Sequence, residues 1–280
     1  IGATTDCNPL YIRINPYEGM KYTVAESYRN LIACNINPLA ITNNLNFASP
    51  LDPNIMGELV LSIDGLKTAA EKFNTPIVSG NVSLYNQTNE IPIKPTPVIG
   101  MVGSNQDLKK INSNKFCNIG NKILVLGKQL EKNLSPYLLQ DQNLASNINE
   151  YNDLMELDLD YEKKVADCVL KMSDFKYIMS CNDISRGGVF LSLLKMQYKD
   201  MGFKVNIPDP IDLFCEYSAG YVIEIRNEDL NNVSSFLSKN GVGYFEIGEI
   251  IKENIEINSK KFDYFDIINN YHNNFEKIIN

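Results

Sequence analysis

Hydrophobic residues in the first third of the chain follow two kinds of spacing. In residues 22–34 and 56–73 they return every three or four positions, which predicts two amphipathic helices. Shorter apolar runs predict strands, at residues 1–5, 39–42, 76–79, 82–85 and 91–102. The strand at 76–79 is expected to end at Gly80-Asn81. Because the first strand begins without an initiator Met, we expect the chain to be a piece of something longer.

Helices and strands alternate in the rest of the chain, which predicts an α/β domain. Strands are expected at 122–127, 177–180, 221–225 and 243–250, and helices at 151–172, 189–198 and 230–239. The intervening stretch 104–121 is polar and weakly periodic, so it predicts a domain boundary. We therefore expect a first domain at 1–106, a linker at 107–120, a second domain at 121–253 and a tail at 254–280.

Composition narrows the classes of protein to consider. The 280 residues are 44% hydrophobic and 21% charged, as in an ordinary globular protein. No apolar run approaches the roughly 18 residues of a membrane span, and there is no secretory signal. The net charge of −8 argues against a nucleic-acid surface. Six widely spaced cysteines are typical of reduced thiols, so we expect a cytoplasmic protein with neither nucleic-acid nor membrane partners.

The chain has a single histidine, His272, within an Asn-rich C-terminal stretch. This excludes a multi-histidine metal site and argues against a Ser-His-Asp triad or a histidine base in the core. We expect His272 to be a solvated residue on a terminal helix. Any phosphate ligand must be held locally, by backbone amides, a metal ion and one or two cations.

Carboxamides follow the predicted strand at 39–42. Asn43, Asn44 and Asn46 come at its carboxyl end, where α/β folds gather ligands. The same residues are also typical of an Asx-rich turn that leads into the helix beginning near Pro53. Both interpretations stay open.

A second polar stretch covers residues 79–86. Gly80 lets a ligand approach the backbone closely, and the Asn81 carboxamide oxygen is a hard donor that suits Mg²⁺. Ser83 lies two positions on, hence on the same face of an extended segment, where its hydroxyl could donate to a phosphate or substrate oxygen. An ordinary Gly-Asn turn accounts for the sequence equally well.

A third stretch, residues 181–188, lies between a predicted strand and a predicted helix. Asp183 and Ser185 are candidates to cap that helix, and the pair Gly187-Gly188 lets the chain turn tightly. A phosphate at the helix N-terminus is the alternative. The structural interpretation is favoured here.

Several motifs, taken together, are typical of one family. They are Thr5-Asp6-Cys7-Asn8-Pro9, Pro16-Tyr17-Glu18-Gly19, Pro38-Leu39-Ala40, Asn44-Leu45-Asn46-Phe47, Gly80-Asn81-Val82-Ser83-Leu84-Tyr85-Asn86, and Asp183-Ile184-Ser185 with Gly187-Gly188. In order and spacing the chain resembles the second half of the phosphoribosylformylglycinamidine synthases. The resemblance is dense over residues 2–103 and thinner beyond.

The resemblance implies an AIR-synthetase-like unit: a β-rich N-terminal domain that pairs with a counterpart into a barrel, followed by an α/β C-terminal domain. It implies a ligase of purine biosynthesis, which converts formylglycinamide ribonucleotide, ammonia from a glutaminase and ATP to formylglycinamidine ribonucleotide, ADP and phosphate. The family's catalytic histidine belongs to the first half, and here Asp6-Cys7-Asn8-Pro9 stands at the corresponding position. We therefore expect no catalytic residue in this chain, and a site completed by the first half.

By the same resemblance, Asn43 and Gly80 contact ATP, Asn81 ligates Mg²⁺ and Ser83 contacts the ribonucleotide. We expect these residues to cluster at the ends of two neighbouring strands. The sequence departs from the family at Asn43, where an Asp is usual, and at Ala48, Asn182, Arg186 and Tyr221. Two alternatives stay open: a non-catalytic half that packs the barrel and docks the glutaminase, and a relative such as AIR synthetase.

Overall fold

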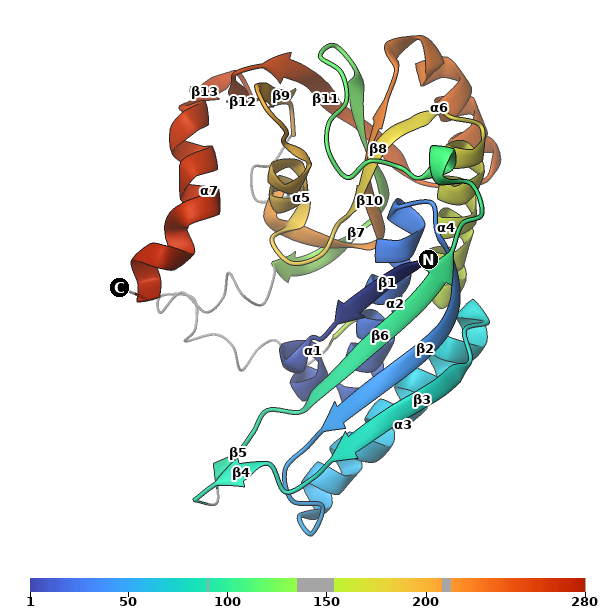
Figure 1. The fold of residues 1–280 in the computed structure, drawn as a ribbon, viewed down its shortest axis with the longest axis vertical. Helices are drawn as coiled ribbons and strands as arrows, with labels where there is room; N and C mark the ends of the chain where they lie inside the picture. Colours follow the sequence, from blue (N-terminus) through green and yellow to red (C-terminus); the bar gives the residue numbers. More distant parts are fainter. Residues whose placement is uncertain (90, 135–153, 208–212, 280) are drawn as a thin grey trace. The chain divides into compact units, whose positions relative to one another are not determined.

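The computed structural model of the chain describes residues 1–89, 91–134, 154–207 and 213–279. These residues form two compact units. The first contains residues 1–111 and 154–170, and the second contains the described residues of 112–134 and 171–279. Each unit has its own main sheet (Figure 1). The division between residues 111 and 112 falls within the expected linker 107–120. No helix in the described part of the chain combines the length and apolar composition that a membrane span requires.

The first unit is built on a four-stranded sheet in the order β1-β6-β2-β3. Its strands are β1 (Gly2–Asp6), β6 (Thr96–Ser104), β2 (Asn37–Asn46) and β3 (Ile77–Ser83). β2 and β3 are parallel, whereas β6 is antiparallel to both β1 and β2. The helices α1 (Pro9–Ile14), α2 (Pro16–Ala33) and α3 (Pro53–Phe73) lie on one side of this sheet (Figure 1). A small hairpin of β4 (Gln87–Thr88) and β5 (Ile91–Pro92) follows β3.

The two long helices of the first unit begin earlier than their apolar periodicity predicts. The side chain of Asn15 accepts a hydrogen bond from the backbone N–H of Glu18 at the start of α2, and Pro16 takes the first helical position. At the start of α3, the side chain of Asp52 accepts a hydrogen bond from the backbone N–H of Asn54, and Pro53 takes the first helical position. An Asn or Asp cap followed by proline is a signal for the start of a helix. The sequence therefore contains the signal for these earlier helix starts.

β3 runs unbroken from Ile77 to Ser83, so the expected break at Gly80-Asn81 is wrong. The reason is the neighbouring strand. β2 pairs with β3 in parallel register from Ile41↔Ile77 to Asn46↔Ser83, and this ladder carries the backbone through the glycine. Among the described strands β3 pairs with β2 alone, and it forms an edge of the four-stranded sheet.

The second unit contains a seven-stranded sheet in the order β13-β12-β9-β11-β7-β10-β8. The strands are β7 (Lys122–Leu134), β8 (Ile178–Asp183), β9 (Met201–Val205), β10 (Cys215–Ile225), β11 (Tyr244–Lys252), β12 (Ile255–Ile257) and β13 (Lys260–Phe262). Within this sheet β12 and β9 pair in parallel, and the other strand pairs of the described residues are antiparallel. The mixed α/β architecture is confirmed, although the alternation of elements produces a largely antiparallel sheet.

Four helices accompany the second sheet. α5 (Gly188–Met196), α6 (Leu230–Lys239) and α7 (Tyr264–Ile279) belong to the second unit, while α4 (Leu159–Asp174) begins in the first unit and ends in the second. The predicted start of α4 at 151–153 lies outside the described residues. The segment expected as a tail, 254–280, supplies β12, β13 and α7, and its Tyr264 is part of the hydrophobic core.

A buried carboxylate organises one end of the second sheet. Glu224 on β10 is fully buried and accepts hydrogen bonds from the backbone N–H groups of Cys117 (2.9 Å) and Asn118 (3.0 Å). It also accepts from Asn121 Nδ2 (2.7 Å) and Ser180 Oγ (2.6 Å). Four donors satisfy this carboxylate, which allows a charged group to lie in the core.

Candidate functional site

Polar side chains form successive pairs across β2 and β3 on one face of the first sheet. Thr42 Oγ1 lies 2.7 Å from Ser79 Oγ, and Asn81 Nδ2 donates to Asn44 Oδ1 at 2.9 Å. Next along the register, Asn46 faces Ser83. On β2 these polar residues alternate with Ile41 and Leu45, which are buried. Because strand side chains alternate between faces, the polar pairs lie on the face opposite that core.

Asn81 and Ser83, two of the predicted site residues, share this polar face. Asn81 is exposed, and its hydrogen bond to Asn44 engages the amide nitrogen, so the amide oxygen is the end open to a ligand. Ser83 is half-buried at the last position of β3, and its hydroxyl lies 3.3 Å from Asn86 Oδ1. The sequence-based expectation that these two side chains lie on one face agrees with the strand geometry.

Asn43 and Gly80, the other two predicted site residues, are register partners on the opposite face. A Cβ atom placed on Gly80 would lie 2.6 Å from Asn43 Oδ1, so the Asn43 side chain already occupies the space beside the glycine. The expectation of a single cluster is therefore corrected: the structure forms two pairs, Asn81 with Ser83 and Asn43 with Gly80, on the two faces of the β2–β3 ribbon. The physical cause is the two-residue period of a strand.

Asn44 is the residue that the sequence-based list of site residues omits. It contacts Asn81 directly, whereas Asn43, one position earlier, faces the other way. The signal that could have found it is the alternation along β2: Ile41 and Leu45 are buried core residues, so Thr42, Asn44 and Asn46 must share the remaining face.

The donors on this face fit Mg²⁺ only as a partial coordination shell. Asn81 offers one neutral amide oxygen, a hard ligand of the kind that Mg²⁺ accepts. Among the described residues there is no group of three or more His, Cys, Asp and Glu side chains placed to hold a metal ion. A metal ion bound at Asn81 would therefore take its other ligands from phosphate oxygens, water or another part of the protein.

The stretch 181–188 carries a structural arrangement that differs from the expected one. The N-cap of α5 is Gly187, in a left-handed conformation with φ of 80° and without a side-chain cap. The expectation that Asp183 or Ser185 caps this helix is wrong, because both lie further from the helix start. The carbonyl of Asp183 accepts a hydrogen bond from Ser192 Oγ at 2.7 Å, and that of Ser185 accepts one from Gly188 N at 2.9 Å.

The segment after β1, where the family's first half carries its histidine, makes structural contacts. Asp6 accepts hydrogen bonds from Ser27 Oγ (2.6 Å) and Asn30 Nδ2 (3.0 Å). The side chain of Asn8 is buried and caps α1 through the N–H of Tyr11 at 3.2 Å. His272 lies exposed on α7, as expected.

Two family models match the chain in succession. The model described as AIR synthase related protein, N-terminal domain, matches residues 1–104, and the corresponding C-terminal domain model matches residues 118–259. The first matches the unit that carries the β2–β3 ribbon, and the second matches most of the seven-stranded unit.

Curated relatives and solved structures agree with this assignment. Phosphoribosylformylglycinamidine synthase subunit PurL from Pelagibacter ubique is 36% identical over 98% of this chain, and that from Petrotoga mobilis is 33% identical over 100%. The chain spans 38% and 39% of their lengths. A structure titled "T. maritima PurL complexed with FGAR" superposes with a TM-score of 0.74 at 15% identity, covering 95% of this chain and 46% of that one. This chain belongs to the AIR synthase related protein family and contains both domains of its unit, in the form found in PurL subunits.

Proposed function

We propose that this chain is the second AIR-synthase-like half of a phosphoribosylformylglycinamidine synthase. The whole enzyme would convert formylglycinamide ribonucleotide, ATP and glutamine-derived ammonia to formylglycinamidine ribonucleotide, ADP and phosphate. The observation that carries the proposal is the identity of 33–36% to PurL subunits across 98–100% of the chain. The polar face of the β2–β3 ribbon supplies a surface suited to that chemistry.

In this proposal the two faces of the ribbon serve different parts of the reaction. Ser83 contacts formylglycinamide ribonucleotide, and Asn81 would contribute one amide oxygen to Mg²⁺. Asn43 and Gly80, register partners on the opposite face, contact ATP. Bound Mg²⁺ offsets charge on the phosphoryl group that ATP transfers to the substrate amide oxygen. The chain's own contribution is to bind and orient, and its single histidine lies on α7.

The remaining groups of the site would come from partner polypeptide. The chain spans less than two fifths of its curated relatives, so a first half of the same synthase is the partner that completes the site. A glutaminase subunit or domain is the proposed source of ammonia. The six cysteines, all within the described residues, form no disulfide, which fits a reducing cytoplasmic compartment.

Substitutions on the polar face test the proposal in the assembled synthase. Asn81→Ala should raise the Mg²⁺ concentration for half-maximal activity about tenfold, and Ser83→Ala should raise KM for formylglycinamide ribonucleotide about tenfold, each equivalent to one lost polar contact. Steady-state kinetics and thermal unfolding measure the two effects. Gln87→Ala, an exposed residue of β4, is the matched control and should change neither.

A second candidate function is a scaffold half that packs the barrel and docks the glutaminase. The observation in its favour is the apolar surface of β3, where Val78 is 67% exposed and Val82 55% exposed. Under this alternative, Asn81→Ala and Ser83→Ala lower the melting temperature of the assembled synthase and leave KM and the Mg²⁺ dependence unchanged. That result would refute the site assignment.

A further inference from the structure

Asn86 joins the ends of β2 and β3 through its side chain. Its Nδ2 donates to the carbonyl of Phe47 at 3.0 Å and to the carbonyl of Ser83 at 2.9 Å. Both carbonyls belong to the segments that end the two parallel strands. One half-buried carboxamide therefore links the two strand ends and the turn that follows them.

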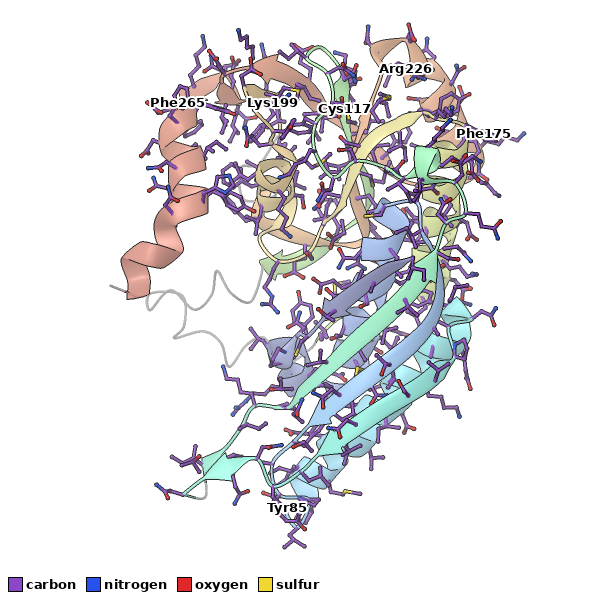
Figure 2. All side chains as sticks on the ribbon, in the orientation of Figure 1. Tyr85, Cys117, Phe175, Lys199, Arg226 and Phe265 are labelled. Atoms are coloured by element: carbon purple, nitrogen blue, oxygen red, sulfur yellow. The ribbon has the colours of Figure 1, made fainter. Side chains whose placement is uncertain are left out.

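Backbone contacts hold the same turn. The N–H of Asn86 donates to Phe47 O at 3.2 Å, and the N–H of Tyr85 donates to Ala48 O at 3.0 Å. Tyr85 has φ of 62°, a left-handed conformation that costs an aromatic residue about 1 kcal/mol or more. Figure 2 labels Tyr85 beyond the carboxyl ends of β2 and β3. The contacts of Asn86 and Tyr85 hold this strained turn in place.

The donors of Asn86 determine how its carboxamide meets Ser83. Nδ2 also lies 3.2 Å from Ser83 Oγ, but a primary amide has two N–H donors, and the carbonyls of Ser83 and Phe47, at 2.9 and 3.0 Å, are the nearer acceptors for both. The amide oxygen is therefore the end that serves the Ser83 hydroxyl, at 3.3 Å. With its proton directed to Asn86 Oδ1, Ser83 Oγ presents lone pairs to the open face of the sheet.

We propose that Asn86 is a positioning residue for the substrate: it orients the Ser83 hydroxyl so that Ser83 accepts a hydrogen bond from an N–H or O–H group of formylglycinamide ribonucleotide. This inference rests on the proposed function, which assigns Ser83 to that substrate. It differs from the sequence-based expectation, in which the Ser83 hydroxyl donates to a phosphate or substrate oxygen.

A double-mutant cycle in the assembled synthase tests the proposal. Asn86→Ala should lower kcat/KM for formylglycinamide ribonucleotide about tenfold and leave KM for ATP within about twofold, because the lost orientation affects one substrate contact. In a Ser83→Ala background the same substitution should lower kcat/KM less than about twofold, since the hydroxyl that it orients is gone. If Asn86→Ala prevents folding, Asn86→Ser, which retains one hydroxyl donor for the turn, takes its place and should give the same two results.

Each other outcome has a definite meaning. An equal loss from Asn86→Ala in both backgrounds, or a parallel rise in KM for ATP, would assign Asn86 to the fold alone and overturn the inference. No change from Asn86→Ala or Asn86→Ser, with a loss from Ser83→Ala, would overturn the inference and leave the proposed function standing. If Ser83→Ala itself changed nothing, the proposed role of Ser83 would fail first.

Discussion

On β2 and β3, a shift of one position along a strand determines which side chains come into contact. Asn43 and Asn44 are adjacent and identical in type, yet Asn44 bonds to Asn81 while Asn43 lies beside Gly80 on the other face. The sequence indicates that both stretches are polar and lie near strand ends. It does not by itself give the register of β3 against β2, and that register selects which carboxamide meets which.

Gly80 provides a test at the residue scale. An alanine Cβ at position 80 would lie 2.6 Å from Asn43 Oδ1, so Gly80→Ala should displace the Asn43 side chain. Because the obstacle is the end of a flexible side chain, we expect a loss of only about 1 kcal/mol in the free energy of unfolding. KM for ATP in the assembled synthase should rise severalfold, since both proposed ATP contacts change. Denaturant unfolding and steady-state kinetics give the two values.

Gly57 is the matched control for that substitution. It lies inside α3, where an added Cβ meets nothing within 4 Å. Gly57→Ala should raise the free energy of unfolding by about 0.5–1 kcal/mol through helix propensity and leave KM for ATP unchanged. If Gly80→Ala stabilised the protein as Gly57→Ala does, the contact between Asn43 and position 80 would not constrain the strand.

For helices and strands, the sequence predicts whether an element exists and of which type it is better than it predicts where the element begins and ends. Helix α6 (Leu230–Lys239) has the predicted bounds, because its apolar residues recur every three or four positions. β10 (Cys215–Ile225) was expected only at 221–225, yet all eleven of its residues are buried. It lies between β7 and β8, so the polar and small residues Glu216, Ser218 and Gly220 are covered by neighbours that the local sequence does not reveal.

Glu224 on β10 supports a prediction about the second unit. Replacing it by alanine would leave four donors without their acceptor, two of them on the buried residues Asn121 and Ser180 and two on the backbone of Cys117 and Asn118. We expect Glu224→Ala to lower the free energy of unfolding by about 3 kcal/mol or more. Urea unfolding measures the change.

Glu224→Gln separates the hydrogen-bond contribution from packing. Glutamine keeps the volume and one acceptor oxygen but presents an N–H₂ group to donors, so it should recover only part of the loss. Full recovery of the free energy of unfolding by Glu224→Gln would show that side-chain volume, rather than the four donated hydrogen bonds, accounts for the effect.

For the whole molecule, the chain matches both domains of the family and is much shorter than its curated relatives. Its two units match the N-terminal and C-terminal AIR synthase related domains, yet it spans 38% of the Pelagibacter ubique PurL subunit. The polar face of the β2–β3 ribbon offers amide and hydroxyl groups, among them those of Asn44, Asn81 and Ser83. The single histidine of the sequence, His272, lies on α7 and not on this ribbon.

The measurement that tests this account most directly is ADP formation from ATP and formylglycinamide ribonucleotide, with ammonia supplied, by this chain mixed with a separately expressed first half from the same organism. We predict no turnover by either half alone, turnover on mixing, and a substrate KM about tenfold higher when the chain carries Ser83→Ala. Turnover by this chain alone, or an unchanged KM for the Ser83→Ala mixture, would contradict the claim that it contributes substrate contacts to a site completed by another half.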